Sequence, residues 1–112
     1  MNLRNNKMSK KKKEIRSKFR KDVFERDNHQ CKMCTKKDCE LDAHHITDRT
    51  EIVNGGYVSQ NGISLCCNEC HPKAEKFHIT NGKEWVEGYH PDDLYNKIGS
   101  SKELALKKSK NL

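Results

Sequence analysis

Apolar residues are scarce in this chain, and no stretch of the sequence is long and apolar enough to suggest a membrane span. Only 32% of the 112 residues are hydrophobic and 6% are aromatic, whereas a transmembrane helix needs ~20 consecutive apolar residues. The basic N-terminus also lacks the apolar segment of a secretory signal peptide. We therefore expect a cytoplasmic protein that has no membrane partner.

The same shortage of apolar residues limits the hydrophobic core. A chain of this length is expected to form one domain, and domains with so thin a core often add a metal ion or disulfides. Six cysteines are available for either purpose. In a reducing cytosol, clustered cysteines favour metal binding over disulfide formation.

Positive charge is concentrated near the N-terminus. Residues 1–26 contain eleven Lys or Arg and three Asp or Glu, whereas residues 27–112 contain twelve and thirteen. The net charge of +7 therefore comes from residues 1–26, which would attract a polyanion such as nucleic acid. The other interpretation of this basic segment is a solvated tail that only aids solubility.

Hydrophobic spacing and turn residues predict a mixed fold of helices and strands. Residues 1–13 are expected to be a disordered basic arm, and apolar residues at helical spacing predict a helix over residues 12–26. Strands are expected over residues 41–50 and 57–65. The Asn-Gly-Gly sequence at residues 54–56 is typical of a hairpin turn between them.

The C-terminal half of the chain is predicted to be mainly helical. Three helices are expected, over residues 70–79, 91–98 and 102–109. We therefore divide the chain into the arm, a core over residues 14–82 and a C-terminal helical extension over residues 83–112.

Two pairs of cysteines share the spacing Cys-x-x-Cys. Cys31 and Cys34 form the first pair, and Cys67 and Cys70 form the second. Two thiolates at this spacing can reach one ion from a tight turn, and two such pairs complete a tetrahedron at Zn–S distances of ~2.3 Å. We therefore expect a structural zinc site, in which four thiolates leave no open position for chemistry.

Two further cysteines leave alternatives open. Cys66 directly precedes Cys67, so Cys66 and Cys70 are an alternative second pair with the spacing Cys-x-x-x-Cys. The matched spacing favours Cys67. Cys39 belongs to neither pair and is expected to be a free thiol.

A group of histidines offers a second kind of site. Adjacent side chains on a strand point to opposite faces, so His44 and His45 cannot easily bind one ion together. One of them is then available as a ligand and the other as a base. On the helix that follows, His71, Glu75 and His78 lie on one face, so His71 and Glu75 can share a cation. A lone histidine is more often a hydrogen-bonded surface residue, but these candidates fall at coherent spacings.

Three segments of the sequence resemble the HNH endonucleases. They read Asp-Ala-His-His-Ile at residues 42–46, Asn-Gly-Ile-Ser-Leu-Cys at residues 61–66 and Cys-His at residues 70–71. The resemblance covers residues 19–78, about half of the chain. It implies a small α+β fold with a ββα-metal (His-Me finger) core, a structural four-cysteine zinc site, an N-terminal basic helix and short C-terminal helices.

The resemblance also implies roles for single residues. His44 corresponds to a ligand of the catalytic divalent cation, and His45 corresponds to the general base. Asn61 corresponds to a residue that orients the loop of the base or, in some members, contacts the metal. His71 corresponds to a further ligand, and Glu75 stands where some members have another histidine ligand.

The reaction implied by the resemblance is hydrolysis of phosphodiester bonds in DNA. A neutral imidazole can take the proton of the attacking water near pH 7. A cation on His44 and His71, with Glu75 or Asp42 nearby, would neutralise charge on the phosphate. Such a mixed nitrogen and oxygen ligand set accepts Mg²⁺, Mn²⁺, Ni²⁺ or Zn²⁺, and we expect Mg²⁺. The alternative is a zinc-stabilised module that binds nucleic acid without cutting it.

The expected partner is double-stranded DNA in a bacterial or phage-infected host cytosol, and cutting both strands would be served by a homodimer. Binding would come mainly from phosphate contacts, which weaken as the salt concentration rises. The basic residues expected to make these contacts are Lys10, Lys11, Lys12, Lys13, Arg16, Arg20, Lys73 and Lys76.

Overall fold

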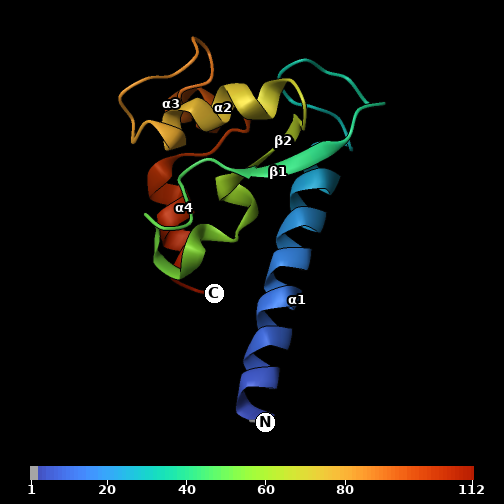
Figure 1. The fold of residues 1–112 in the computed structure, drawn as a ribbon, viewed down its shortest axis with the longest axis vertical. Coiled ribbons are helices and arrows are strands. Elements are labelled where there is room, and N and C mark those ends of the chain that lie inside the picture. The colour runs from blue at the N-terminus through green and yellow to red at the C-terminus, as the bar shows by residue number, and fades with distance from the viewer. Residues whose placement is uncertain (1–2) are drawn as a thin grey trace.

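A computed structural model describes the backbone of residues 3–112 and the side chains of residues 10–112. Within this part of the chain, four α-helices surround a two-stranded antiparallel sheet, which is the small α+β fold expected from the sequence (Figure 1). The strands are β1 (Leu41–His45) and β2 (Gly62–Cys66). The helices are α1 (Leu3–Arg26), α2 (Cys70–Ile79), α3 (Pro91–Lys97) and α4 (Lys102–Ser109).

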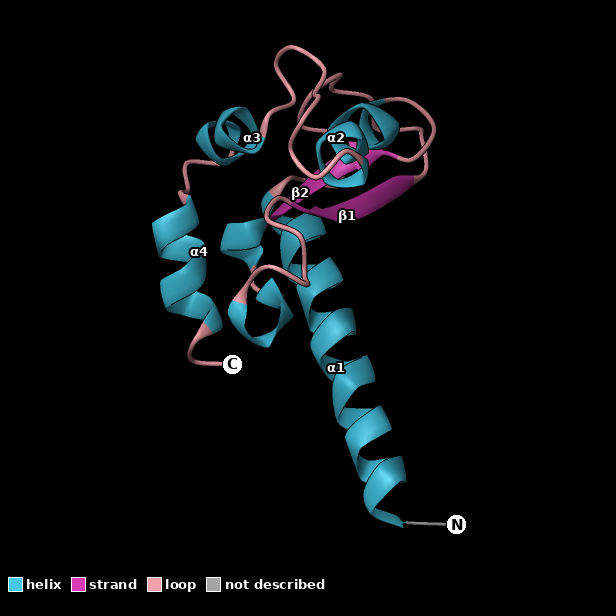
Figure 2. Ribbon diagram, turned by 60° about the vertical axis from the view of Figure 1, so that its left-hand side comes forward, coloured by secondary structure: helices cyan, strands magenta, loops and turns pink. Residues whose placement is uncertain are grey.

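The hairpin formed by β1 and β2 separates two environments. Helix α2 lies on one face of the hairpin and the end of α1 lies on the other (Figures 1 and 2). Side chains alternate along a strand, so His44 points toward α2, whereas His45, paired with Gly62, points toward α1. The alternation expected for the two histidines is therefore confirmed, and it places them in different surroundings.

Helix α1 is longer than the sequence analysis expects. It begins at Leu3 rather than near residue 12, so the segment expected to be a disordered arm is helical from residue 3 onward. Residues 1 and 2 lie outside the described part of the chain. The segment contains neither proline nor glycine, and lysine and arginine are good helix formers. High charge indicated that this segment is solvated, but charge alone does not prevent a helix.

The end of α1 is fastened to β2 by close packing and by polar contacts. Phe19 and Val23 are buried where α1 crosses Gly62, and a Cβ atom at Gly62 would come within 2.5 Å of the Val23 side chain. Only glycine allows the helix to approach so closely. After the helix, Asp27 accepts a 2.9 Å hydrogen bond from the backbone N–H of Ser64. The position of the hairpin relative to α1 is therefore set by the packing of the helix on Gly62 and by the hydrogen bond between Asp27 and Ser64.

The two strands are shorter than expected, and the connection between them is long. Ile46 N–H donates to Asn61 O over 2.9 Å at the mouth of the hairpin. Beyond this bond the chain forms two 3-10 turns, η1 (Val53–Gly56) and η2 (Ser59–Asn61). Residues 54–56 have φ angles of 55°, 75° and 65°. They do form a turn, as their sequence suggests, but this turn lies within a long loop.

The helices after the hairpin agree closely with the sequence. The predicted bounds of α2 and α4 are confirmed, and α3 ends one residue before the expected position. The largest buried apolar side chains are Ile46, Ile63, Leu65 and Leu94, so the core lies between the hairpin and the helices that follow it. Among the described residues, no helix combines the length and the apolar character that crossing a membrane requires.

Candidate metal centres

Three cysteines come together beside the start of α2. The sulfur atoms of Cys31, Cys34 and Cys70 lie within 4.8 Å of one another, so this group can hold a metal ion. Cys31 and Cys34 lie in the turn after α1, which is held to β2 by a 3.0 Å hydrogen bond from Lys32 N–H to Ser64 O. Cys70 is the first residue of α2. The cluster therefore joins the turn after α1 to the start of α2, two segments that are distant in the sequence.

The backbone favours ionised sulfur at one of these positions. Burial alone would raise the pKa of Cys31, but hydrogen bonds from nearby backbone N–H groups, including Cys34 N–H at 3.5 Å from the Cys31 sulfur, lower it. Burial raises the pKa of Cys70 to about 11. A bound cation would stabilise the thiolate form of both residues, and thiolate is the form that binds metal.

Of the two adjacent cysteines left open as the fourth ligand, Cys66 rather than the preferred Cys67 lies beside this cluster. Cys66 Sγ lies 3.3 Å from Cys34 Sγ, and Cys66 is bonded to Cys39 in a disulfide, so Cys39 is not a free thiol. Cys67 lies outside the group and has its side chain beside Asp42. Consecutive residues at the end of a strand point to opposite faces, so only one of the two adjacent cysteines can turn toward the cluster.

A second group joins β1 to α2. Atoms of His44, His71 and Glu75 lie within 4.8 Å of one another, and this group can also hold a metal ion. Glu75 Oε1 is 3.2 Å from His44 Nδ1 and 3.2 Å from His71 Nε2. Ligands at ~2.0 Å from a tetrahedral ion are ~3.3 Å from each other. Glu75 is therefore spaced from each of the two histidines as neighbouring ligands of a tetrahedral ion would be, and the structure brings together the three residues that the sequence analysis names as ligands.

The buried member of this group is His44. Its ring is almost completely inaccessible to solvent, and neither ring nitrogen makes a hydrogen bond of good geometry, although Nδ1 lies beside the carboxylate. Burial lowers the pKa of His44, so the ring is neutral and has a lone pair available. The adjacent imidazoles of His44 and His71 hold the pKa of Glu75 well below its usual range. A neutral imidazole without a partner beside a carboxylate fits a cation bound between them.

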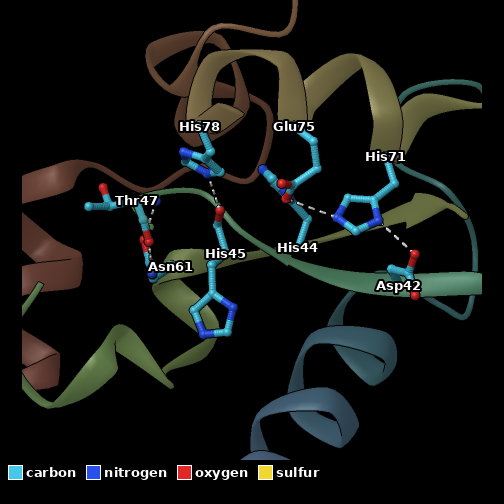
Figure 3. Close-up of polar contacts among 8 residues, drawn as sticks. All are labelled: Asp42, His44, His45, Thr47, Asn61, His71, Glu75 and His78. Atoms are coloured by element: carbon cyan, nitrogen blue, oxygen red, sulfur yellow. Dashed lines mark hydrogen bonds and ion pairs between the residues drawn. The ribbon is translucent and has the colours of Figure 1, made fainter. Parts of the chain in front are cut away.

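Asp42 orients the second histidine of the group. His71 Nδ1 is 2.7 Å from Asp42 Oδ2, and Nδ1–H donates to this carboxylate, whereas the other ring nitrogen, Nε2, lies 3.2 Å from Glu75 Oε1 and faces the ligand group (Figure 3). The hydrogen bonds to Glu75 and Asp42 raise the pKa of His71, although burial opposes this effect. Carboxylate groups commonly support metal-binding histidines in this way. Asp42, expected near the ion, therefore lies behind His71.

His45 is separated from this group. Its ring points to the α1 side of the hairpin, away from His44 (Figure 3). There it stacks on Phe19 with centroids 4.5 Å apart and meets the Tyr57 ring at 4.7 Å. Burial lowers the pKa of His45 to about 4, and its Nε2 is buried without a hydrogen-bond partner. His78 lies on the α2 side of the hairpin, where its ring stacks on His44 and its Nε2 donates to the backbone carbonyl of His45 over 2.9 Å. The structure therefore brings His78, rather than the His45 ring, to the group on α2.

Asn61 is buried and holds the loop that follows β1. Its Oδ1 accepts hydrogen bonds from Thr47 N–H and from the Tyr95 hydroxyl, and its Nδ2 donates to Thr47 O and Gly56 O. The resemblance implied that this asparagine either orients the loop of the base or contacts the metal. Its contacts fit the first of these roles. Sequence reasoning missed Tyr95, because nothing in a short amphipathic helix indicates a hydrogen bond to a residue 34 positions away.

The predicted DNA-contacting residues lie on two helices. Six of them are on α1, which projects from the body of the molecule (Figure 2). The other two are on α2, where Lys73 lies over the Tyr89 ring at 5.6 Å and Lys76 is 3.7 Å from Glu84. The basic residues of α1 are therefore the larger group of available positive charges.

No protein-family model, curated protein or solved structure matches this chain. The chemistry of the two groups must therefore be argued from their atoms. One group consists of sulfur ligands beside the core, and the other combines two imidazoles with a carboxylate. Sulfur ligands are typical of structural ions, whereas three nitrogen and oxygen ligands are typical of sites that keep an open position.

Proposed function

We propose that this protein is a metal-dependent endonuclease that hydrolyses phosphodiester bonds in DNA, in the manner of the HNH enzymes. In this proposal β1, β2 and α2 form a ββα-metal core, and His44, His71 and Glu75 hold the divalent cation. The observation that carries the proposal is the spacing of these three ligands, with Asp42 supporting His71 from behind. A purely structural role would not require a buried histidine without hydrogen bonds beside a carboxylate.

The exposure of the ligands supports access for a substrate. His44 is buried, whereas the side chains of His71 and Glu75 are 26% and 36% exposed, so the group opens toward solvent on one side. A divalent cation bound there would stabilise the negative charge that develops on the phosphoryl oxygens. Mg²⁺ is the proposed ion, and Mn²⁺, Ni²⁺ and Zn²⁺ also suit this ligand set.

His45 is the proposed acceptor of the proton from the attacking water. Its lowered pKa keeps the ring neutral, and therefore able to accept a proton, although the same shift makes it a weaker base. The ring and the ligand group lie on opposite faces of β1. A phosphate could contact both only at the edge of β1 that does not pair with β2. There His45 would take the proton of the attacking water, and a cation held by His44, His71 and Glu75 would stabilise the charge on the leaving oxygen.

The cysteine group is proposed to bind a structural zinc ion. Cys31, Cys34 and Cys70 would supply three thiolates, and Cys66 would supply the fourth once its disulfide with Cys39 is reduced. Four thiolates complete a tetrahedral zinc site and leave no position for a substrate. The ion would fasten the end of α1, the end of β2 and the start of α2 to one another.

A second function is favoured by one observation, the apolar surroundings of His45. Its stacking on Phe19 and its contact with Tyr57 are what a packed structural residue would show. In that case the protein would be a zinc-stabilised module that binds nucleic acid without cutting it. The ligand group of His44 and His71 would then hold a second structural ion.

Plasmid nicking distinguishes the two functions. Purified wild-type protein, His45→Ala and a His29→Asn control on the exposed turn after α1 are incubated with supercoiled plasmid and Mg²⁺. The endonuclease proposal expects cutting by wild type and the control, and a loss of at least about a hundredfold in His45→Ala. Equal cutting by all three proteins would remove His45 from the mechanism, and no cutting by any of them would favour the binding module.

A further inference from the structure

A cleft lies between α1 and the turn η1. It has a volume of about 400 Å³ and lies on the side of the hairpin opposite the His44 group. One wall is a face of α1, and the other comes from the loop between β1 and β2. The residues used in the argument below are Lys11, Lys12, Ile15, Arg16, Gly55 and Tyr57.

The α1 wall of the cleft is strongly positive. Lys11, Lys12 and Arg16 line the cleft, and none of the described residues that line it has an acidic side chain. Lys12 and Arg16 are four residues apart and so lie one turn apart on one face of the helix. Among the ion pairs formed by the described side chains, none involves these three residues. Their charge is therefore available to an anionic ligand.

The opposite wall is formed by Asn54, Gly55, Tyr57 and Leu112, and it holds an aromatic ring in a fixed position. The Tyr57 ring meets His45 at 4.7 Å and Phe19 at 5.7 Å, both in edge-to-face geometry. A Cβ atom at Gly55 would lie 2.6 Å from the Tyr57 ring, so glycine is needed for the ring to occupy this position. Ile15 adds apolar surface on the α1 side of the cleft. The cleft thus combines a cationic helix face with a fixed aromatic ring.

This combination matches one nucleotide of an unpaired strand. A nucleotide has an anionic phosphate and a largely apolar base, and proteins that bind single strands pair a basic groove with aromatic side chains. A volume of about 400 Å³ is in the range of pockets that take one small molecule. A duplex is much wider and keeps its bases stacked inside. We infer that the cleft between α1 and η1 binds an unpaired segment of a DNA strand.

Tyr57 connects this cleft to the proposed base. The same ring lines the cleft and contacts the His45 ring, so a strand bound in the cleft would be separated from His45 by one side chain. The substrate of the proposed endonuclease would then be DNA that contains an unpaired segment, such as a flap or a frayed end. This assignment of the substrate rests on the proposed function, whereas strand binding in the cleft does not.

The test compares two double variants of α1 that remove the same charges. Lys12→Gln with Arg16→Gln alters the cleft, and Lys18→Gln with Lys21→Gln alters residues of the same helix that neither line it nor are among the predicted DNA contacts. Binding of a fluorescently labelled single-stranded oligonucleotide, and of a blunt duplex of the same sequence, is followed by anisotropy. No divalent cation is added, a gel confirms that the strands are intact, and thermal melting confirms that each variant is folded.

The cleft variant is expected to bind the single strand at least about tenfold more weakly than wild type, and the control at most about threefold more weakly. The dependence of log K on log salt concentration should become shallower by about 1.4 in the cleft variant, because two phosphate contacts are lost. Equal losses in the two variants would overturn the proposal, as would equally tight binding of the duplex by wild type. Because cutting is not measured, these results are independent of the nicking assay.

Discussion

The two ligand groups of this protein contrast in chemistry and in position. The cysteine group is built from soft sulfur atoms, and two of its members, Cys31 and Cys70, are buried in the hydrophobic core. The second group uses harder nitrogen and oxygen atoms, and two of its members, His71 and Glu75, are partly exposed. Both groups include a residue from the first turn of α2, so the same helix connects them.

This difference in chemistry and position predicts that the cysteine group supports folding and that the second group supports the reaction. A thiolate group in the core is expected to contribute directly to folding, because a thin hydrophobic core gains much from an ion that joins distant elements. A partly exposed group of imidazole and carboxylate contributes less to folding and remains accessible to a substrate. Changes to the first group should therefore affect folding, and changes to the second should affect ion binding and cutting.

The largest effect is expected from the cysteine group. Cys31→Ser should abolish cooperative folding, because a hydroxyl does not replace a thiolate at a buried zinc ion. The matched control is Cys67→Ser, which should melt as wild type does, because Cys67 lies outside the group. Thermal unfolding followed by circular dichroism measures both. A native-like melting curve for Cys31→Ser would contradict the structural role of this group.

The next largest effect is expected from the group of His44, His71 and Glu75. His71→Ala should keep the melting curve and the zinc content but lose binding of a second ion by more than about a hundredfold, since loss of an outer-shell partner alone costs about 10–100-fold. Calorimetric titration of Mn²⁺ into zinc-loaded protein measures this affinity. Unchanged Mn²⁺ binding would show that the ligand is misassigned, and a collapsed melting curve would show that the two groups do not differ in role.

A smaller effect is expected from Asp42, which supports His71. Asp42→Asn removes the charge that orients His71 and should weaken Mn²⁺ binding by about 10–100-fold. Cys67→Ser again serves as the control, because its side chain also lies beside Asp42. If Asp42→Asn bound Mn²⁺ as tightly as wild type, the hydrogen bond to His71 would have no supporting role.

The pH dependence of stability tests the third environment, around His45. Its pKa is about 4 in the folded protein and ~6.5 in the unfolded chain. The unfolded chain therefore binds more protons between these values, and the free energy of unfolding decreases as the pH falls from ~6.5 toward 4. His45→Phe keeps an aromatic ring against Phe19 and removes this titration. Between pH 7 and 4.5 it should lose about 2 kcal/mol less stability than wild type.

Urea unfolding at the two pH values measures this difference, with His29→Asn as the control for an exposed histidine. Acid also protonates the ligands of both groups, but that effect is common to all three proteins. An identical loss of stability in wild type and His45→Phe would mean that His45 is solvated rather than packed against Phe19.

Local patterns were sufficient for much of this molecule. The bounds of α2 and α4 are as predicted, because helical spacing and end signals such as the Ser101 cap are short-range features. The alternation of side chains along a strand correctly predicted that His44 and His45 point to opposite faces of the hairpin. The spacing of His71 and Glu75 on a helix likewise predicted their shared group.

Other features depend on contacts that the sequence does not encode locally. The choice between Cys66 and Cys67 depends on which face of β2 turns toward Cys34, and a shift of one residue reverses it. The network of Asn61 and Tyr95 joins distant segments, so no periodic pattern reveals it. The apolar surroundings of His45 could have been found only by placing α1 against the hairpin.

The central claim is that the group of His44, His71 and Glu75 holds the divalent cation that DNA hydrolysis requires. It is tested most directly by nicking of supercoiled plasmid on addition of Mg²⁺ to zinc-loaded wild-type protein and to His44→Ala, with zinc content and melting measured on the same samples. The account predicts that wild type cuts and that His44→Ala, with its zinc and fold intact, does not. Equal Mg²⁺-dependent cutting by the two proteins would contradict it.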